Sequence, residues 1–267
     1  MQKTVIEAMN YSVLAGGKRL RPMLMQETYK LFGGDGEIIK PFMAALEMIH
    51  TYSLVHDDLP AMDNDEYRRG KKTTHAVFGE AMGILAGDAL LNYAFEIASD
   101  ALCIETSPKV AKALQILSKK AGIYGMIGGQ VADIESEGKK VGIDVVEFIH
   151  RLKCGALIES AMLIGAVLAG ASQEEQDKIE QIGADIGYAF QIQDDILDVT
   201  SSTEVIGKPV GSDEKNEKST YVSIKGLEQA KKDVCEMSNR ALLTLSSFPY
   251  KNEFLEELIK KLINREK

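Results

Sequence analysis

Helical periodicity runs through almost the whole of this 267-residue sequence and limits the folds open to it. Near the C-terminus, apolar side chains recur at the spacing of one buried helix face, at Leu255, Leu258, Ile259, Leu262 and Ile263. The same periodicity predicts helices over residues 40–59, 76–103, 108–132, 144–170, 173–200 and 221–246. No run alternates between apolar and polar residues as a half-buried strand does. The sequence therefore predicts an all-α protein, with residues 1–267 forming a single large helical bundle.

The composition supports a buried core and excludes some partners. Hydrophobic residues make up 45% of the chain, and the net charge is -9. A general nucleic-acid surface needs a basic excess, so any anionic ligand must be bound by local Lys and Arg residues or through a metal ion. The three cysteines (Cys103, Cys154 and Cys235) lie far apart, which indicates no disulfide framework and favours a reducing compartment.

One apolar stretch, Gly155 to Ser172, is membrane-like in composition. It carries Glu159, it is rich in Ala and Gly, and its uninterrupted apolar part is short for a bilayer. We expect a buried core helix there rather than a membrane span. The N-terminal residues show no apolar signal-peptide core, so we expect a cytoplasmic protein.

Two aspartate clusters stand within this helical pattern. They contain Asp57, Asp58 and Asp63, then Asp194, Asp195 and Asp198. Adjacent carboxylates beside apolar sequence are unfavourable unless a cation neutralises them. Mg²⁺ suits such sites, because it takes few carboxylates and fills its other positions with water and phosphate. Two clusters facing each other across a cavity would bind several Mg²⁺ ions and, through them, a diphosphate. The alternative is a solvated acidic surface.

The two clusters differ in local geometry. Asp194 and Asp198 share one helix face, whereas Asp195 points elsewhere and is expected to orient a neighbour or pair with a lysine. Asp57 is predicted near a helix C-terminus, where the helix dipole disfavours anions. Because Pro60 disfavours further helix at the residue before it, a bend there could bring Asp63 back beside Asp57.

Basic residues accompany the first cluster. Residues 16–22 (Gly-Gly-Lys-Arg-Leu-Arg-Pro) form a glycine turn, a group of cations and a helix start, which together favour phosphate oxygens. Residues 68–72 (Arg-Arg-Gly-Lys-Lys) follow the first cluster closely. His50 shares a helix face with Asp57 and could donate a hydrogen bond to a phosphate. Each basic stretch alone could equally be a solvated loop.

Residues 201–219 break the helical pattern. They are polar and contain Gly207, Pro209 and Gly211. Because the segment directly follows the second cluster, we expect a mobile lid, with a plain disordered surface loop as the alternative.

The ordered set of motifs resembles the trans-isoprenyl diphosphate synthases, over nearly the whole chain. The matching motifs are residues 16–22, His50, His-Asp-Asp-Leu-Pro-Ala-Met-Asp at 56–63, 68–70, Gly-Gly-Gln at 128–130 with Asp133, Lys153, Phe-Gln-Ile-Gln-Asp-Asp-Ile-Leu-Asp at 190–198, 207–208 and 218–221. The resemblance implies the isoprenoid synthase fold, a helical bundle around a central cavity.

The resemblance also implies roles for individual residues. The isopentenyl diphosphate site would use Gly17, Lys18, Arg21, His50 and Arg69. The metal ligands would be Asp57, Asp63 and Asp194 with Asp58 close by, binding about three Mg²⁺ ions that bridge the allylic diphosphate. Residues in contact with the allylic substrate would be Arg68, Lys153, Gln191, Lys208 and Lys218, of which Lys153, Gln191 and Lys208 would be catalytic. Cys154 stands where the family usually has Thr, and a thiol is a poorer hydrogen-bond donor.

The residues before the first cluster bear on product length. Tyr52 could form the floor of the hydrocarbon cavity, and the small Ser53 leaves some depth. With the longer spacing of Asp57-Asp58-x₄-Asp63, this resembles bacterial farnesyl diphosphate synthases, with a geranyl or geranylgeranyl product as the alternative. The expected substrates are isopentenyl diphosphate and dimethylallyl or geranyl diphosphate, and the family implies a homodimer.

Three other readings have some support. His50 and His56-Asp57 faintly resemble an HD-type metal phosphohydrolase, which would not need the second cluster or residues 16–22. A catalytically silent partner subunit would be expected to lose one cluster or its arginine pair, and both are present. A terpene cyclase would lack the isopentenyl site around Lys18, Arg21 and His50.

Overall fold

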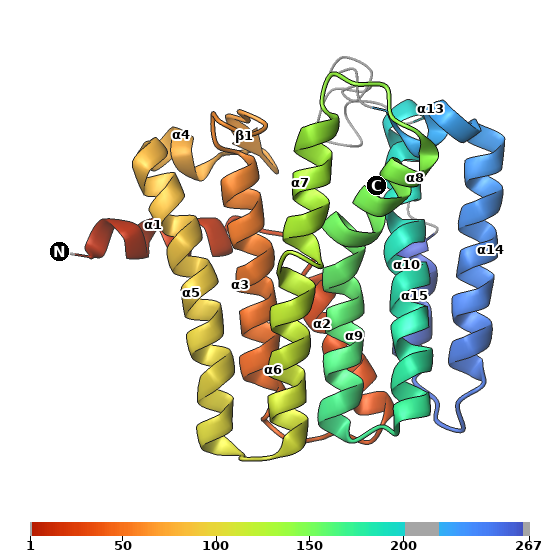
Figure 1. Cartoon of the computed structure of the whole chain (residues 1–267). Helices are drawn as coiled ribbons and strands as arrows, with labels where there is room; N and C mark the ends of the chain where they lie inside the picture. The colour runs from red at the N-terminus through yellow and green to blue at the C-terminus, as the bar shows by residue number, and fades with distance from the viewer. Residues whose placement is uncertain (1, 201–218, 264–267) are drawn as a thin grey trace. The chain divides into compact units, whose positions relative to one another are not determined.

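The computed structural model describes residues 2–200 and 219–263 and consists almost entirely of helices (Figure 1). The all-α prediction is therefore confirmed. The described residues form two compact units. Among the described residues, the first unit is drawn from 2–23 and 36–114, and the second from 24–35, 115–200 and 219–263.

The first unit is built around two long helices, α3 and α5, which pack side by side (Figure 1). Its elements are α1 (Lys3–Val13), α3 (Ile39–Asp57), β1 (Tyr67–Arg68), β2 (Lys71–Lys72), α4 (Thr74–Phe78) and α5 (Glu80–Ile104). Phe42, Leu46 and Ile49 of α3 are fully buried. Gly87 of α5 permits the close packing, because a Cβ atom there would lie 2.0 Å from the His56 imidazole.

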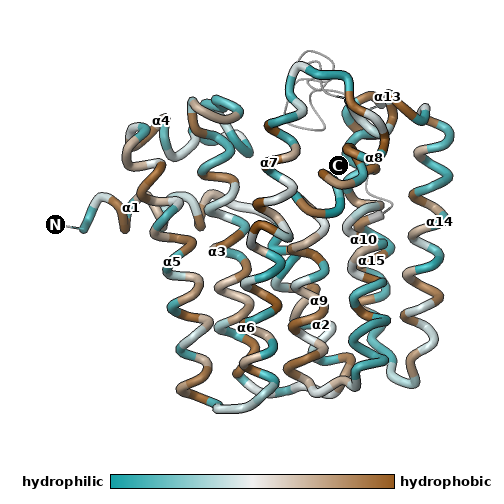
Figure 2. Tube along the Cα trace, in the orientation of Figure 1, coloured by the Kyte–Doolittle hydropathy of each residue, from teal (hydrophilic) through white to brown (hydrophobic). Residues whose placement is uncertain are grey.

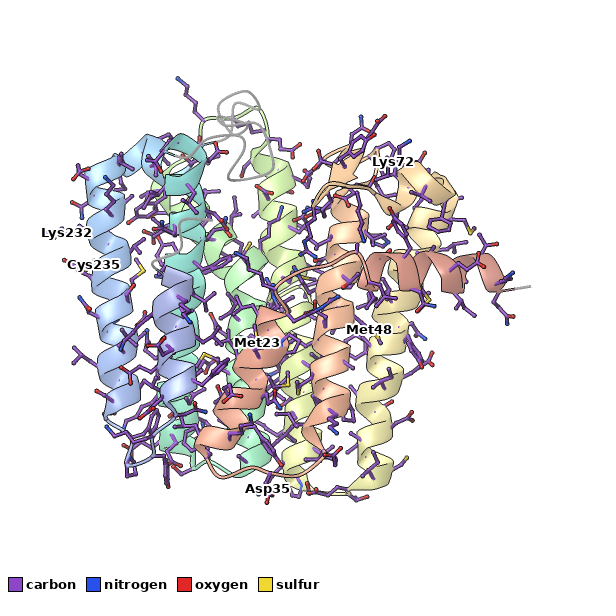
Figure 3. The ribbon with its side chains drawn as sticks, turned by 180° about the vertical axis from the view of Figure 1, so that it is seen from behind. Met23, Asp35, Met48, Lys72, Lys232 and Cys235 are labelled. Carbon is purple, nitrogen blue, oxygen red and sulfur yellow. The ribbon has the colours of Figure 1, made fainter. Side chains whose placement is uncertain are left out.

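The second unit contains the remaining helices. They are most of α2 (Leu20–Leu31), the end of α6 (Pro108–Ala121), α7 (Met126–Ser136), α8 (Ile143–Ile149), the π-helix η1 (His150–Gly155), α9 (Ala156–Ala169), α10 (Gln173–Thr200), α13 (Tyr221–Lys225), α14 (Leu227–Ser246) and α15 (Glu253–Ile263). Helix α10 packs against both α9 and α14. Lys232 and Cys235 project from α14 (Figure 3), and all three cysteines are free thiols.

Helix α9 forms the centre of the second unit's core. It is apolar along most of its length (Figure 2), and nearly all of its residues are buried. A Cβ atom at Gly165 would lie 2.4 Å from the Met25 carbonyl oxygen, so only glycine allows α2 to approach this closely. The stretch Ile143–Ala169 is long and apolar enough to span a membrane, but most of its apolar part is buried inside the protein. That burial agrees with the expected core helix.

Three predicted helices are interrupted at a glycine. The helix predicted over 76–103 divides at Gly79, which has a φ of 86° and separates α4 from α5. The prediction of one helix over 108–132 is wrong, because α6 ends at Ala121 and α7 begins at Met126. Gly125 lies in this break, where an added Cβ would lie 2.0 Å from the Lys120 carbonyl oxygen. The predicted helix 221–246 divides at Gly226, which has a φ of 83°. The short β1–β2 hairpin was not predicted, because its two-residue strands are too short to show a pattern.

Candidate active site

The chain reverses direction directly after the first two aspartates. The backbone N–H of Asp63 donates a 2.9 Å hydrogen bond to the Asp57 carbonyl oxygen, and the N–H groups of Met62 and Asn64 both bond to the Leu59 carbonyl oxygen. This is the bend that Pro60 predicts. Asp57 is half-buried and Asp63 is exposed, so both side chains can be reached from solvent.

Asp58 is held differently from the other two aspartates of its cluster. It is only 4% exposed, and its Oδ1 atom accepts a 2.7 Å hydrogen bond from Nε of Arg68 and forms an ion pair with Nη2 of the same guanidinium, also at 2.7 Å. Burial raises the pKa of Asp58 to about 6, although the Arg68 guanidinium acts in the opposite direction. The pair connects the end of α3 to the hairpin.

The hairpin turn places a second arginine beside the glycine turn. Arg69 and Gly70 form the two-residue loop between β1 and β2, with φ angles of 54° and 74°, as a tight hairpin requires. Arg69 Nη1 donates a 2.7 Å hydrogen bond to the Gly16 carbonyl oxygen. A Cβ atom at Gly17 would lie 2.6 Å from the same Nη1 atom. Gly17 is thus required where the backbone meets the guanidinium.

His50 lies within a group of arginines. Burial, followed by the charges of Arg21, Arg69, Arg68 and Arg19, holds its pKa well below the usual value. His50 is therefore neutral at pH 7 in a strongly positive environment, which suits a phosphate group. Arg19 has a φ of 50°, and its guanidinium donates hydrogen bonds to the Glu47 carboxylate and the Val13 carbonyl oxygen. Lys18, the residue before it, is exposed.

Tyr52 follows His50 by two residues on α3 and is buried. It is 6% exposed, and its ring meets the His56 imidazole edge-on at 5.7 Å. His56 Nε2 lies 3.0 Å from the carbonyl oxygen of Ile84 in α5. The Ser53 hydroxyl is bonded to the His50 carbonyl oxygen. Tyr52 therefore sits against the α3–α5 core, below Asp57 on the same helix.

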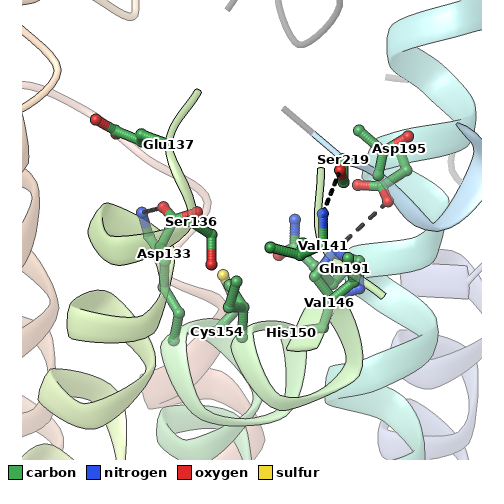
Figure 4. Close-up of a pocket in the computed structure, with 13 residues that line it drawn as sticks. Asp133, Ser136, Glu137, Val141, Val146, His150, Cys154, Gln191, Asp195 and Ser219 are labelled. Carbon is green, nitrogen blue, oxygen red and sulfur yellow. Dashed lines mark hydrogen bonds and ion pairs between the residues drawn. The ribbon is translucent and has the colours of Figure 1, made fainter. Parts of the chain in front are cut away.

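A cavity of about 180 Å³ lies in the second unit (Figure 4). Lys153, Cys154 and Gln191 line it, so three residues singled out from the sequence meet in one place. Lys153 lies on the π-helix, and its Nζ atom is 2.6 Å from Oδ2 of Asp133 on α7. Single π-turns are rare and occur frequently at functional sites. Asp194 is half-buried on α10, whereas Lys208 and Lys218 lie outside the described residues, as does the predicted lid except Ser219.

Asp195, which was singled out in the sequence, and His150, which was not, also line this cavity. Asp195 accepts a 2.8 Å hydrogen bond from the backbone N–H of Tyr221, as a residue that orients a neighbour. Its Oδ2 atom lies 3.6 Å from Nε2 of His150, whose pKa is lowered to about 4 by burial. The backbone N–H of Val141 donates a hydrogen bond to the Ser219 hydroxyl, and both residues line the cavity (Figure 4). The only sequence signal for His150 was its position three residues before Lys153.

Within residues 2–200 and 219–263, no three His, Cys, Asp or Glu side chains gather closely enough to bind a metal ion by themselves. The first aspartate cluster belongs to the first unit and the second cluster to the second unit.

The chain is similar to known proteins over most of its length. The polyprenyl synthetase family model matches residues 2–248. Farnesyl diphosphate synthase of Geobacillus stearothermophilus is 48% identical over 226 residues, which cover 84% of this chain and 76% of that protein. Geranylgeranyl diphosphate synthase of Cyanophora paradoxa is 43% identical over 250 residues, covering 89% and 83% respectively.

Solved structures show the same likeness. An apo farnesyl/geranylfarnesyl diphosphate synthase from Zymomonas mobilis superposes with a TM-score of 0.87 at 35% identity, covering 98% of this chain and 89% of that one. A geranyltransferase from Helicobacter pylori, solved with magnesium and isoprenyl diphosphate, gives 0.84 at 34% identity, covering 97% and 87%.

The chain belongs to the polyprenyl synthetase family. It has the all-α isoprenoid synthase fold and is a prenyltransferase that elongates prenyl chains. The resemblance found in the sequence is confirmed, and the HD-type phosphohydrolase reading has no remaining support.

Proposed function

We propose that this enzyme condenses isopentenyl diphosphate with dimethylallyl or geranyl diphosphate to form farnesyl diphosphate, using Mg²⁺. The observation that carries the proposal is the neutral His50 among Arg21, Arg68 and Arg69, in the same unit as the folded-back Asp57 and Asp63. A cationic pocket beside solvent-accessible carboxylates suits a diphosphate next to a metal ion.

Isopentenyl diphosphate is assigned to the cationic group of the first unit. Arg69 is fixed against the glycine turn by its bond to Gly16, and Gly17 leaves room for the guanidinium. Arg21 and Lys18 supply further positive charge. His50, being neutral, can donate a hydrogen bond to a phosphate oxygen without itself adding charge.

The available donors fit Mg²⁺. Asp57, Asp63 and Asp194 offer carboxylate oxygens that are not buried, and Asp58 directly follows Asp57. Three carboxylates leave most coordination positions to water and diphosphate oxygens, as Mg²⁺ prefers. When bound, about three Mg²⁺ ions would neutralise the allylic diphosphate and make it a better leaving group. The magnesium complex of the Helicobacter pylori geranyltransferase supports this assignment.

The second unit is assigned to the reacting end of the allylic substrate. Lys153, with Arg68, Lys208 and Lys218, would bind the allylic diphosphate and stabilise its negative charge as the C–O bond breaks. The Gln191 amide dipole would stabilise the allylic carbocation. The isopentenyl double bond then attacks this cation, and a proton is lost to the departing diphosphate. Cys154, a weaker donor than Thr, is expected to weaken diphosphate binding.

The farnesyl product is proposed from the buried Tyr52. Its ring stands below Asp57 on α3, where it can limit the length of the hydrocarbon chain. A geranylgeranyl product is the alternative, because geranylgeranyl diphosphate synthases are among the relatives. Chromatography of the dephosphorylated products from isopentenyl and geranyl diphosphate distinguishes the two: a C15 alcohol supports the proposal, and a predominant C20 alcohol would overturn it. We expect a cytoplasmic homodimer.

A further inference from the structure

The last turn of α1 carries a tyrosine that reaches the arginine hairpin. The Tyr11 hydroxyl donates a 2.6 Å hydrogen bond to the Lys72 carbonyl oxygen, 61 positions further along the chain. Lys72 lies on β2 and pairs with Tyr67 of β1. The bond from Tyr11 therefore attaches the second strand of the hairpin to α1.

Two further contacts join this end of α1 to α4. The Tyr11 ring meets the Phe78 ring edge-on, with 5.6 Å between the ring centroids. The Ser12 hydroxyl donates a hydrogen bond to the Ala8 carbonyl oxygen, and its oxygen lies 2.7 Å from the Thr74 hydroxyl oxygen. Because α4 directly follows β2 in the chain, α1 is attached both to the strand and to the helix after it.

A small cavity of about 40 Å³ separates α1 from part of the hairpin. Tyr11 and Ser12 of α1 line it, together with Arg68, Arg69 and Lys72 of the hairpin. Side chains therefore do not fill the space between the two elements, and close packing alone does not fix the hairpin. The directional bond from the Tyr11 hydroxyl crosses the same boundary.

The end of α1 also leads into the glycine turn. Helix α1 ends at Val13, three residues before Gly16. The Arg19 guanidinium bonds back to the Val13 carbonyl oxygen and to the Glu47 carboxylate, and Arg69 bonds to the Gly16 carbonyl oxygen. The glycine turn and the arginine hairpin, which together supply the cations of the proposed isopentenyl diphosphate site, are thus both attached to the last turn of α1.

We propose that Tyr11 is a positioning residue of the isopentenyl diphosphate site: through the Lys72 carbonyl oxygen, its hydroxyl holds the hairpin where Arg69 meets the glycine turn. The inference rests on the proposed function and deepens it. Arg69 lies in the two-residue loop beside β2, so its guanidinium follows any displacement of that strand. Arg68 has its own bond to the Asp58 carboxylate, so the allylic substrate is expected to be affected less.

Hydrogen exchange of the Thr73 amide tests the Tyr11 bond without reference to activity. The Thr73 N–H directly follows β2 and donates a 2.9 Å hydrogen bond to the Glu66 carbonyl oxygen, across the open end of the hairpin. Tyr11→Phe removes the hydroxyl and keeps the ring against Phe78, so the fold should be retained. We expect exchange about fivefold faster in Tyr11→Phe. The matched control is Tyr67→Phe, at a side chain on β1 that is 60% exposed, which should exchange at the wild-type rate. Unchanged exchange in Tyr11→Phe would overturn the proposal.

Steady-state kinetics tests what the bond does for substrate binding. In Tyr11→Phe the KM for isopentenyl diphosphate should rise about fivefold, whereas the KM for geranyl diphosphate and kcat should stay within about twofold of wild type. A purely structural role would reduce the fraction of active enzyme, so kcat would fall and both KM values would be unchanged. That result, or an equal rise in both KM values, would overturn the positioning role. If the wild-type enzyme does not elongate prenyl chains, the proposed function fails, and Thr73 exchange still decides whether Tyr11 holds the hairpin.

Discussion

The Nζ atom of Lys153 lies 2.6 Å from Oδ2 of Asp133, which joins the π-helix to α7 across the wall of the cavity. Both side chains are mostly buried, so the pair fixes where the ammonium group points. Because Lys153 is assigned to the allylic diphosphate, Asp133 controls the geometry of that contact without itself needing to touch the substrate.

Replacing Asp133 with Asn is therefore expected to impair allylic substrate binding. The ammonium group loses its charged partner, and the KM for geranyl diphosphate should rise about tenfold, with a smaller effect on isopentenyl diphosphate. Steady-state kinetics with each substrate varied in turn measures both values. Ser136→Ala, which alters another residue lining the cavity, is the matched control and should change neither KM by more than about twofold. Equal effects of Asp133→Asn on both substrates would contradict the assignment.

Arg69→Gln tests the isopentenyl site. Loss of the guanidinium removes its bond to Gly16 and one charge beside His50, so the KM for isopentenyl diphosphate should rise about 10–100-fold. The control is Lys71→Gln, because Lys71 is exposed on the other strand of the same hairpin. If Lys71→Gln has the same effect as Arg69→Gln, the contribution is general electrostatic attraction rather than a specific site.

Tyr52→Ala should lengthen the product. Removing a ring that is 6% exposed opens space below Asp57, so C20 and longer prenyl chains should appear. Product chromatography makes the measurement. The control is Tyr124→Ala, at a side chain that is 84% exposed, which should give the wild-type product. Products of Tyr52→Ala no longer than those of wild type would remove Tyr52 as the cavity floor.

His150 makes stability depend on pH. Its pKa of about 4 lies below the usual value of about 6.5, so the unfolded chain binds the proton more readily. Its contribution to stability is complete above about pH 6.5 and is lost as the pH falls toward 4. Wild type should therefore lose about 2 kcal/mol more than His150→Gln between pH 7 and pH 5, as measured by urea unfolding. Parallel pH dependences of the two proteins would place His150 in a more hydrated environment.

Much of the fold was predictable, because helices bury apolar residues at a regular spacing. The bend that returns Asp63 to Asp57 was also predictable, because Pro60 restricts the residue before it. The break between α6 and α7 was not predicted, because Ile123 and Tyr124 extend the apolar sequence, although both side chains are exposed between the two helices.

The site was predictable in its residue types but less so in its pairings. The arginines and aspartates were found by motif, and the structure brings His50, Arg21 and Arg69 together. The bond between Asp195 and Tyr221 joins residues 26 positions apart, so no local pattern could reveal it. The π-helix that presents Lys153 likewise has no recognisable sequence signature.

Metal-dependent chain elongation is the most direct test of the central claim. Purified enzyme is incubated with labelled isopentenyl diphosphate and geranyl diphosphate, with Mg²⁺ or with excess chelator. The account predicts that label enters a C15 diphosphate only when Mg²⁺ is present, and that Asp57→Ala abolishes this incorporation. Release of diphosphate from geranyl diphosphate in the presence of Mg²⁺, with no label in a longer chain, would contradict it.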